Sequence, residues 1–316
     1  MISIVVPAYQ EQGNIDSLVA GIKHVLVTEK EWEIILVDDG SNDNTWERIS
    51  KLYDADSRVR GLRLTRNFGH QHALLAGLFF ATGDAVITMD ADLQHPPEVI
   101  PELLEEWRNG YRIVNTIRTD HRNIPWIKRF TSKIFYYVFS LLSGVRLSAG
   151  MADFRLLDRQ VVDRLLDFGE YHLFLRGMVQ WMGYSNCTIP YNSGKRLSGN
   201  SQYSFGKMVK LAWTGITSYS IIPLRLATTV GIITSIFAFG GLIYAFYARF
   251  VVSNAVAGWT SLISFLSLLF GILFIVIGVL GEYIARILEQ VRGRPRFIVS
   301  EQMGLPSSFK RRVETK

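Results

Sequence analysis

Residues 85–98 read AVITMDADLQHPPE, and this stretch decides the fold. A short apolar run, 85–89, ends in Asp90 and Asp92, and two prolines follow. Such a run, bounded by turn residues, is typical of a buried strand. Side chains two apart on an extended segment point the same way, so the two carboxylates can converge on one hard cation, with Gln94 as a further oxygen ligand. Solvated carboxylates of an ordinary turn match the same pattern, so both interpretations stay open.

The sequence on either side of this stretch alternates between two patterns over the first 120 residues. Further short apolar runs, each ending in polar or Gly/Pro turns, predict strands at 2–7, 32–37, 59–64 and 113–117. Longer stretches with helical periodicity lie between them, at 15–27, 45–53, 70–81 and 97–107. This alternation predicts an α/β fold with a mostly parallel sheet that helices cover on both faces.

Polar side chains gather where the predicted strands end. Ligands of open α/β sheets bind outside the carboxyl ends of the strands, so we expect the functional site at this edge. The second strand ends in Asp38 and Asp39, whose carboxylates can accept hydrogen bonds from a ribose or a base; capping of the next helix is the alternative. The polar residues that follow the strands predicted at 2–7, 32–37, 59–64 and 85–89 are Tyr9, Glu11, Asp38, Asp39, Arg66, Asp90 and Asp92.

Two uncharged apolar runs, 226–247 and 262–281, predict membrane-spanning helices. A run of about 20 residues spans the roughly 30 Å of the hydrocarbon core. Basic residues precede the first run and follow the second, while the loop between them carries one, so the positive-inside rule places both ends in the cytosol. We therefore expect a cytosolic domain over 1–225, a transmembrane hairpin over 226–281 and a basic cytosolic tail over 282–316, in the plasma (inner) membrane.

Composition narrows the class of partner. The formal net charge of +6 is too diffuse to indicate nucleic acid, and it suits anionic lipid or a phosphorylated substrate. The single cysteine, Cys187, excludes an intramolecular disulfide. The N-terminal sequence, MISIVVPAYQ, lacks the features of a signal peptide.

Residues 125–143 are basic and aromatic and predict an amphipathic helix in the membrane interface, with 205–220 as a second candidate; a helix of the globular core is the alternative.

Several motifs together resemble a known family. These are VVPAYQEQGNI (5–15), VDDGSNDNT (37–45), RNFGHQHALLAGL (66–78), MDADLQHPPE (89–98), IPLRL (222–226) and GVLGEYIARILEQVRGRPRFIV (278–299). They resemble the family 2 inverting glycosyltransferases with a GT-A (Rossmann-like) fold, and among these the polyisoprenyl-phosphate glycosyltransferases. Gln202, in SQYSF, departs from the SKYSF of many relatives and removes a cation from that loop.

The resemblance implies a role for each matching residue. Asp90, Asp92 and Gln94 would surround a Mg²⁺ or Mn²⁺ ion, and Asp153 and Arg196, with Asp92, would serve catalysis. Asp153 could instead only pair with a nearby arginine, and the lipid-phosphate cations could simply be solvated. Residues implied to line the nucleotide pocket are Pro7, Tyr9, Glu11, Asp38, Asp39 and Asp90. Residues implied to hold the lipid phosphate are Arg118, Lys128, Arg129 and Ser132.

The implied reaction is inverting transfer of a sugar to polyisoprenyl (undecaprenyl) phosphate for envelope glycan modification. Glucose from UDP-glucose is the expected donor, and UDP-N-acetylglucosamine, UDP-aminoarabinose and GDP-mannose are the alternatives. A processive polysaccharide synthase would carry a QxxRW-type helix, but Gln180-Trp181 lacks the arginine. A nucleotide-sugar sensor would bind the donor without turnover. We expect a homo-oligomer, with a tetramer implied by the resemblance. Helix capping or core hydrogen bonding is the expected role of His70, His72 and His95, whose spacing is poor for a metal site.

Overall fold

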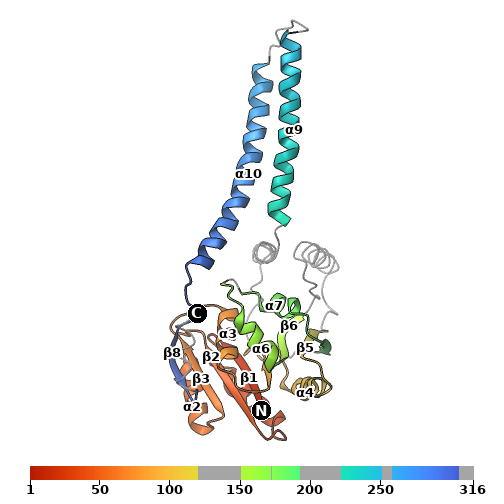
Figure 1. Ribbon diagram of the computed structural model, residues 1–316. Coiled ribbons are helices and arrows are strands. Elements are labelled where there is room, and N and C mark those ends of the chain that lie inside the picture. Colours follow the sequence, from red (N-terminus) through yellow and green to blue (C-terminus); the bar gives the residue numbers. More distant parts are fainter. Residues whose placement is uncertain (120–150, 172, 193–221, 251–257, 306–316) are drawn as a thin grey trace. The chain divides into compact units, whose positions relative to one another are not determined.

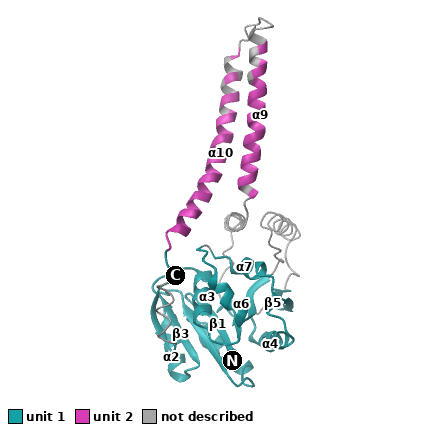
Figure 2. Cartoon of the chain, viewed as in Figure 1, with its two compact units in different colours: residues 1–140, 145–203, 294–316 teal, residues 141–144, 204–293 magenta. Residues whose placement is uncertain are grey.

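The protein was analysed as a computed structural model of the 316-residue chain, which describes residues 1–119, 151–171, 173–192, 222–250 and 258–305 (Figure 1). The chain forms two compact units (Figure 2). The described part of the first unit comprises the residues up to 192 together with those from Arg294 on, and that of the second comprises the residues from 222 to 293. The first unit is therefore made of two stretches of the sequence, one before the second unit and one after it.

The first unit is built on an eight-stranded sheet in the order β7-β5-β6-β4-β1-β2-β3-β8. β1 pairs in parallel with β2 and β4, β2 with β3, and β5 with β7. β6 is antiparallel to both of its neighbours, and β8 is antiparallel to β3. The strands are β1 (Ile2–Ala8), β2 (Trp32–Asp38), β3 (Val59–Leu64), β4 (Ala85–Thr88), β5 (Ile113–Arg118), β6 (Met151–Asp158), β7 (Asn186–Tyr191) and β8 (Val299–Met303).

Helices cover the sheet. The central strands β1, β2 and β4 are buried along their whole length, which explains their continuous apolar sequences. Helix α3 packs very closely on β1 and β2 at Gly77. A Cβ added there would lie 2.3 Å from Val5 Cγ1 and 3.0 Å from Val37 Cγ2, so only glycine fits without a shift of its neighbours. The helices of this unit are α1 (Ile15–Val25), α2 (Thr45–Ala55), α3 (His70–Phe80), the 3₁₀ turn η1 (Pro97–Val99), α4 (Ile100–Arg108), α6 (Arg159–Asp167) and α7 (Leu175–Trp181).

The predicted α/β architecture is confirmed. All five predicted strands and the four predicted helices are present, with ends that differ by at most two residues. The 97–107 helix is split into η1 and α4. The sequence analysis does not predict β6, β7 or β8, and β8 lies in the segment interpreted as a basic tail. Its five residues, VSEQM, alternate only weakly and carry no turn signal that would mark them as a strand.

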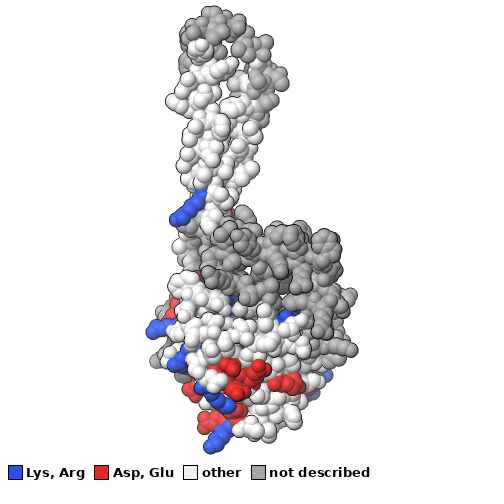
Figure 3. Space-filling model, turned by 90° about the vertical axis from the view of Figure 1, so that its right-hand side faces the viewer, with Lys and Arg blue, Asp and Glu red and all other residues white. Residues whose placement is uncertain are grey.

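The second unit contains the two long helices α9 (Ile222–Phe250) and α10 (Trp259–Val291). Each contains an apolar window long enough to cross a membrane, Leu224–Gly241 and Leu268–Val291, and neither window is buried in the protein. Figure 3 shows a described surface of these helices that is almost entirely uncharged, whereas charged side chains gather on the sheet unit. The length, composition and exposure of α9 and α10 are those expected of membrane-spanning helices.

Candidate functional site

Two neighbouring loops at the carboxyl end of the sheet are joined by hydrogen bonds. The loop after β1 donates its Gln10 N–H to Ser41 Oγ (3.0 Å) in the loop after β2, and its Glu11 N–H to Thr45 Oγ1 (3.0 Å) at the start of α2. Gln10 adopts a φ of 58°, in the left-handed region. Pro7 is buried at the end of β1, whereas Tyr9 is exposed beside it. The two loops thus form one continuous rim that presents Tyr9 to solvent.

Asp38 and Asp39 lie beneath this rim and are both buried. Asp38 Oδ1 accepts the Ser41 N–H (2.9 Å), and the carboxylate of Asp39 accepts the N–H groups of Phe68 (2.8 Å) and Gly69 (2.9 Å). Burial raises the pKa of both carboxyl groups, against the effect of these hydrogen bonds. Asp39 therefore joins the loops that follow β2 and β3, while Asp38 fixes the turn of its own loop.

The loop after β4 carries the Asp90-Ala91-Asp92 sequence. Asp92 Oδ1 accepts the Gln94 N–H (3.1 Å), and Leu93 adopts a φ of 61°, so the loop turns back on itself. Asp90 Oδ1 is buried and accepts no hydrogen bond from the described residues; His70 Nε2 lies 3.4 Å from it. A buried carboxylate oxygen without a hydrogen bond is costly unless a ligand contacts it. Asp90 therefore fits a cation ligand.

His95 supports this loop from within the fold. Its Nδ1 accepts the Asp90 N–H (2.9 Å), and its Nε2 lies 3.6 Å from Asp90 Oδ2. The imidazole is buried and stacked on Phe154, with a centroid distance of 5.1 Å and an interplanar angle of 17°. Burial lowers the pKa of His95, and an Nδ1 that accepts a hydrogen bond requires the proton of the neutral ring to be on Nε2. His95 thus holds Asp90 by backbone and side chain.

The side-chain amide oxygen of Gln94, predicted as a further metal ligand, already accepts a hydrogen bond. Gln94 Oε1 accepts a hydrogen bond from Nη1 of Arg118, the last residue of β5 (3.0 Å). Among the described residues, no group of three or more His, Cys, Asp and Glu side chains is arranged to hold a metal ion. A cation held by Asp90 and Asp92 would therefore take its remaining ligands from elsewhere, and the chemistry of a nucleoside diphosphate fits that need.

Asp153, on β6, is the centre of a buried ion cluster. Arg176, on α7, donates to it through Nε and Nη2, both at 2.8 Å, and Arg155 Nη2 donates at 3.2 Å. Burial acts to raise the pKa of Asp153, but the His70 hydrogen bond and the arginine charges outweigh it and hold the pKa well below its usual range. Asp153 is therefore ionised and held by several donors, which suits an anchoring role better than proton abstraction.

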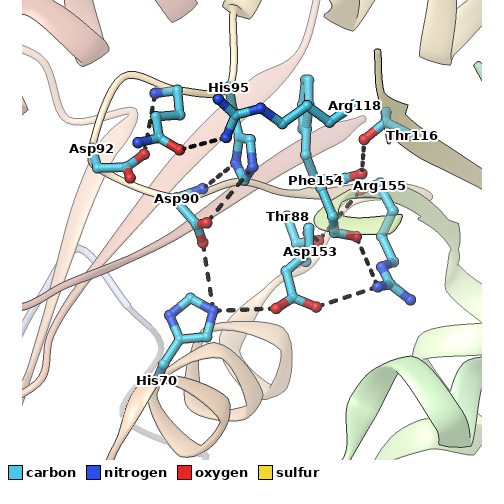
Figure 4. A network of polar contacts seen from close by, with 12 residues as sticks. His70, Thr88, Asp90, Asp92, His95, Thr116, Arg118, Asp153, Phe154 and Arg155 are labelled. Carbon is cyan, nitrogen blue, oxygen red and sulfur yellow. Dashed lines mark hydrogen bonds and ion pairs between the residues drawn. The ribbon is translucent and has the colours of Figure 1, made fainter. Parts of the chain in front are cut away.

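His70 connects the two acidic groups. It is the first residue of α3, and Figure 4 shows its imidazole between Asp90 and Asp153. His70 Nε2 lies 3.4 Å from Asp90 Oδ1 and 3.6 Å from Asp153 Oδ2. Burial lowers the pKa of His70, but the two carboxylates overcome this and the net shift is upward. Residues from α3, from the loop after β4 and from β6 therefore meet at one place at the edge of the sheet.

The structure brings most of the predicted site residues to this edge. Asp90, Asp92, Gln94, Arg118 and Asp153 form one connected region, while the Tyr9–Glu11 and Asp38–Asp39 loops form the neighbouring rim. The other predicted site residues, Lys128, Arg129, Ser132 and Arg196, lie outside the described residues, as do the two predicted interfacial helices. The sequence analysis missed Arg176, because a lone arginine in LRGMVQW carries no pattern that would mark it.

Comparison with known proteins identifies the family. A model of glycosyl transferase family 2 matches residues 3–166, which is more than half of the chain. The chain belongs to glycosyl transferase family 2. Together with the sheet order, this membership supports the predicted GT-A fold. In this glycosyltransferase, the loop that carries Asp38 and Asp39 and the loop that carries Asp90 and Asp92 both lie within the matched segment.

Two relatives align over almost the whole chain. A prophage bactoprenol glucosyl transferase homolog of Escherichia coli (strain K12) is 37% identical over 94% of this chain and 98% of its own. The bactoprenol glucosyl transferase of Shigella phage SfII is 37% identical over 95% and 97%. Among solved structures, the mannosyltransferase PcManGT from Pyrobaculum calidifontis, in complex with GDP-Man and Mn²⁺, is 15% identical and covers 90% of this chain and 86% of its own, with a TM-score of 0.46. The alignments with both relatives include α9 and α10 as well as the sheet unit.

Proposed function

We propose that this glycosyltransferase transfers a sugar from a nucleotide-sugar donor to polyisoprenyl phosphate at the cytosolic face of a membrane. UDP-glucose and undecaprenyl phosphate are the proposed pair, which the names of the full-length bactoprenol glucosyl transferase relatives support. The observation that carries the proposal is the Asp90-Ala91-Asp92 loop, which leaves a buried carboxylate oxygen of Asp90 without a hydrogen bond from the described residues. It lies at the sheet edge in a chain with two membrane-length helices.

The donor diphosphate would meet this loop. Asp90 and Asp92 would hold a Mg²⁺ or Mn²⁺ ion, which would offset the negative charge that develops on the leaving nucleoside diphosphate. Gln94 could join them only by exchanging its hydrogen bond with Arg118. The nucleoside would lie along the rim formed by Tyr9, Glu11 and the loop above Asp38 and Asp39.

The acceptor does not need a strong base. A phosphate monoester is mostly ionised near pH 7, since its second pKa is about 6. One of its oxygens would attack the anomeric carbon while the bond to the donor diphosphate breaks, and the electron pair leaves with the nucleoside diphosphate. This single displacement inverts the anomeric configuration. Asp153 fits the scheme as an ionised anchor for Arg176 and Arg155, because its pKa is too low for proton abstraction.

The fold supports the proposed membrane topology. β8 follows α10 in the chain and pairs with β3, which precedes α9, so both segments lie on one side of any membrane that the helices cross. Two crossings satisfy this condition, with the sheet unit and both termini in the cytosol. The large exposed apolar side chains of α9 and α10 also support assembly into a homo-oligomer in the bilayer, and a tetramer is the proposed form.

The experiment that tests the proposal is product formation in detergent. Purified protein is given undecaprenyl phosphate, Mg²⁺ or Mn²⁺, and radiolabelled UDP-glucose, UDP-N-acetylglucosamine, UDP-aminoarabinose or GDP-mannose in turn. We expect UDP-glucose to label the lipid and the Asp92→Asn variant to lose this activity. Asp163→Asn, which removes an exposed i,i+4 ion pair with Arg159, is the matched control and should retain it. Donor binding without labelling of any lipid, dolichyl phosphate included, would contradict the proposal.

A further inference from the structure

Three charged residues stand directly opposite one another on three adjacent strands. In the register of the sheet, Asp38 of β2 pairs with Arg63 of β3, and Arg63 pairs with Glu301 of β8. Arg63 Nε lies 3.4 Å from Asp38 Oδ2, and Arg63 Nη1 donates to Glu301 Oε1 at 2.9 Å. Cross-strand neighbours of opposite charge attract each other, so the row alternates favourably from the sheet edge inward.

Glu301 is held in place by more than this pair. The indole Nε1 of Trp46, on α2, donates to Glu301 Oε2 at 3.1 Å, and Arg63 Cζ lies 5.8 Å from the centroid of the same ring. The chain just before Glu301 is also held to β3 and the residue after it, since Thr65 N–H donates to Ile298 O and Ser300 Oγ donates to Arg63 O. Figure 1 shows β8 alongside β3 at the edge of the sheet. The carboxylate thus has a defined position beside Arg63.

The inner end of the row leads to the rim of the donor site. Asp38 Oδ1 accepts the Ser41 N–H, and Ser41 Oγ accepts the Gln10 N–H. These two bonds join the loop after β2 to the loop that carries Tyr9 and Glu11. Asp38 itself is fully buried, so its orientation depends on the groups around it and not on solvent.

The Arg63 charge matters because Asp38 is buried. Burial favours the neutral form of a carboxyl group and raises the pKa of Asp38, while Arg63 opposes this shift. A charged carboxylate accepts the Ser41 N–H more strongly than a neutral acid does. Arg63 is partly exposed and could turn to water, but its bond to Glu301 keeps the guanidinium over the sheet edge.

We propose that Glu301, on the strand that follows the membrane helices, is a positioning residue for the donor nucleotide, acting through Arg63 and Asp38 on the Tyr9–Glu11 rim. This inference rests on the proposed function, because it assigns the nucleoside diphosphate of the donor to that rim. It gives the segment after α10 a role in substrate binding and not only in membrane anchoring.

The test compares two charge-removing variants of the full-length protein. Glu301→Gln keeps the size of the side chain and an oxygen for Trp46 but removes the charge facing Arg63. Glu29→Gln removes an ion pair of similar length, between Glu29 and Arg108 at 2.7 and 2.9 Å, outside the rim. Dissociation constants for UDP and GDP are measured by titration calorimetry with Mg²⁺, alongside thermal unfolding and the KM and kcat of transfer.

We expect Glu301→Gln to weaken binding of the nucleotide that the wild type binds by about threefold to tenfold, a change of roughly 0.7–1.4 kcal/mol. The donor KM should rise by the same factor, with the lipid KM and kcat within twofold of wild type and Glu29→Gln unchanged. Arg63→Met should weaken binding at least as much, Arg63→Lys should restore part of it, and Glu301→Gln should add nothing in the Arg63→Met background.

Three results would overturn the inference. These are unchanged nucleotide affinity in Glu301→Gln, an equal loss in Glu29→Gln, or effects of Glu301→Gln and Arg63→Met that simply add. A wild type that binds a nucleotide but transfers no sugar would contradict the proposed function alone, because the dissociation constants still test the positioning role. A wild type that binds neither UDP nor GDP would overturn both.

Discussion

Replacing Asp153 with asparagine should destabilise the catalytic unit far more than the same change five residues along the strand. Asp153 and Asp158 both lie on β6, are both 5% exposed, and each pairs with an arginine. The difference lies in the partners. Arg155 is 3% exposed, whereas the side chain of Arg112 is 44% exposed. Removing a carboxylate therefore leaves a buried cation in one case and a solvated cation in the other.

The expected magnitudes follow from these environments. Breaking a buried ion pair by removing one partner costs about 3–5 kcal/mol. Arg155 Nη2 retains its bond to Ala152 O, so the lower end, about 3 kcal/mol, applies to Asp153→Asn. At Asp158 the exposed pair is worth about 0.2–1 kcal/mol. Asparagine also replaces aspartate well as the N-cap of α6, so Asp158→Asn should cost about 1 kcal/mol or less.

The assay is thermal unfolding of purified protein in detergent, followed by tryptophan fluorescence. At about 2–4 °C per kcal/mol for a unit of this size, we expect a fall in Tm of about 6–12 °C for Asp153→Asn and about 4 °C or less for Asp158→Asn. Equal shifts in the two variants would refute the reasoning, because they would show that the buried Arg155 does not depend on Asp153.

The pH dependence gives a second check on the same variant. The pKa of Asp153 is depressed in the folded protein, so its stabilising contribution is present above the unfolded value of about 3.9 and is lost as the pH falls towards the folded value. The pKa of His70 is raised, so its contribution is present below about 6.5 and is lost as the pH rises through its folded value. The gap in Tm between wild type and Asp153→Asn should therefore be largest near pH 5, narrowing on both sides. A gap that grows below pH 4 would contradict this assignment.

Three further predictions follow from close packing and from single hydrogen bonds. Gly77→Ala should cost about 1–3 kcal/mol in chemical unfolding, because its Cβ would meet Val5 at 2.3 Å, whereas Gly13→Ala, with open space around it, should cost little. His95→Ala should lose about 1–3 kcal/mol of stability, because it leaves the buried Asp90 N–H unpaired; His95→Asn, whose amide oxygen can accept that bond, should recover part of the loss and of the transfer rate. Deleting residues 294–316 should lower the Tm and promote aggregation in size-exclusion chromatography, since it uncovers the β3 edge and removes the buried Phe297, whose burial alone is worth about 1.5–3 kcal/mol; an unchanged Tm would contradict this.

The parts of the fold that the sequence predicts are those in which local pattern and burial agree. β1, β2 and β4 are continuous apolar runs because both of their faces are covered, and the helices between them end at turn residues. β6 is harder to recognise. Its sequence, MADFRLLD, carries Asp153 and Arg155 inside the buried sheet, where charged residues argue against a strand. These charges are tolerated because they pair with each other and with Arg176 from α7, a contact that no local pattern reveals.

In the functional site too, the residues that a local pattern marks are predictable, and those that depend on distant partners are not. The spacing of Asp90 and Asp92 marks the acidic loop, because the geometry of a strand end is local. The roles of the histidines depend on partners far along the chain: His95 stacks on Phe154, and His70 lies beside Asp153. The bond that His95 accepts agrees with the hydrogen-bonding role expected for that residue. Arg63 and Glu301 are separated by 238 positions, so only the pairing of β3 with β8 brings them together.

That separation has a consequence for the order in which the site is completed. β3 is made early in the chain, but its outer edge stays unpaired until β8 emerges, and β8 follows both membrane-length helices. The entropic cost of closing so long a loop grows only with the logarithm of its length, so the long separation adds little to the cost of pairing β8 with β3. If Glu301 positions the donor rim, then the rim reaches its final form only after the chain has been made as far as β8, beyond both long helices.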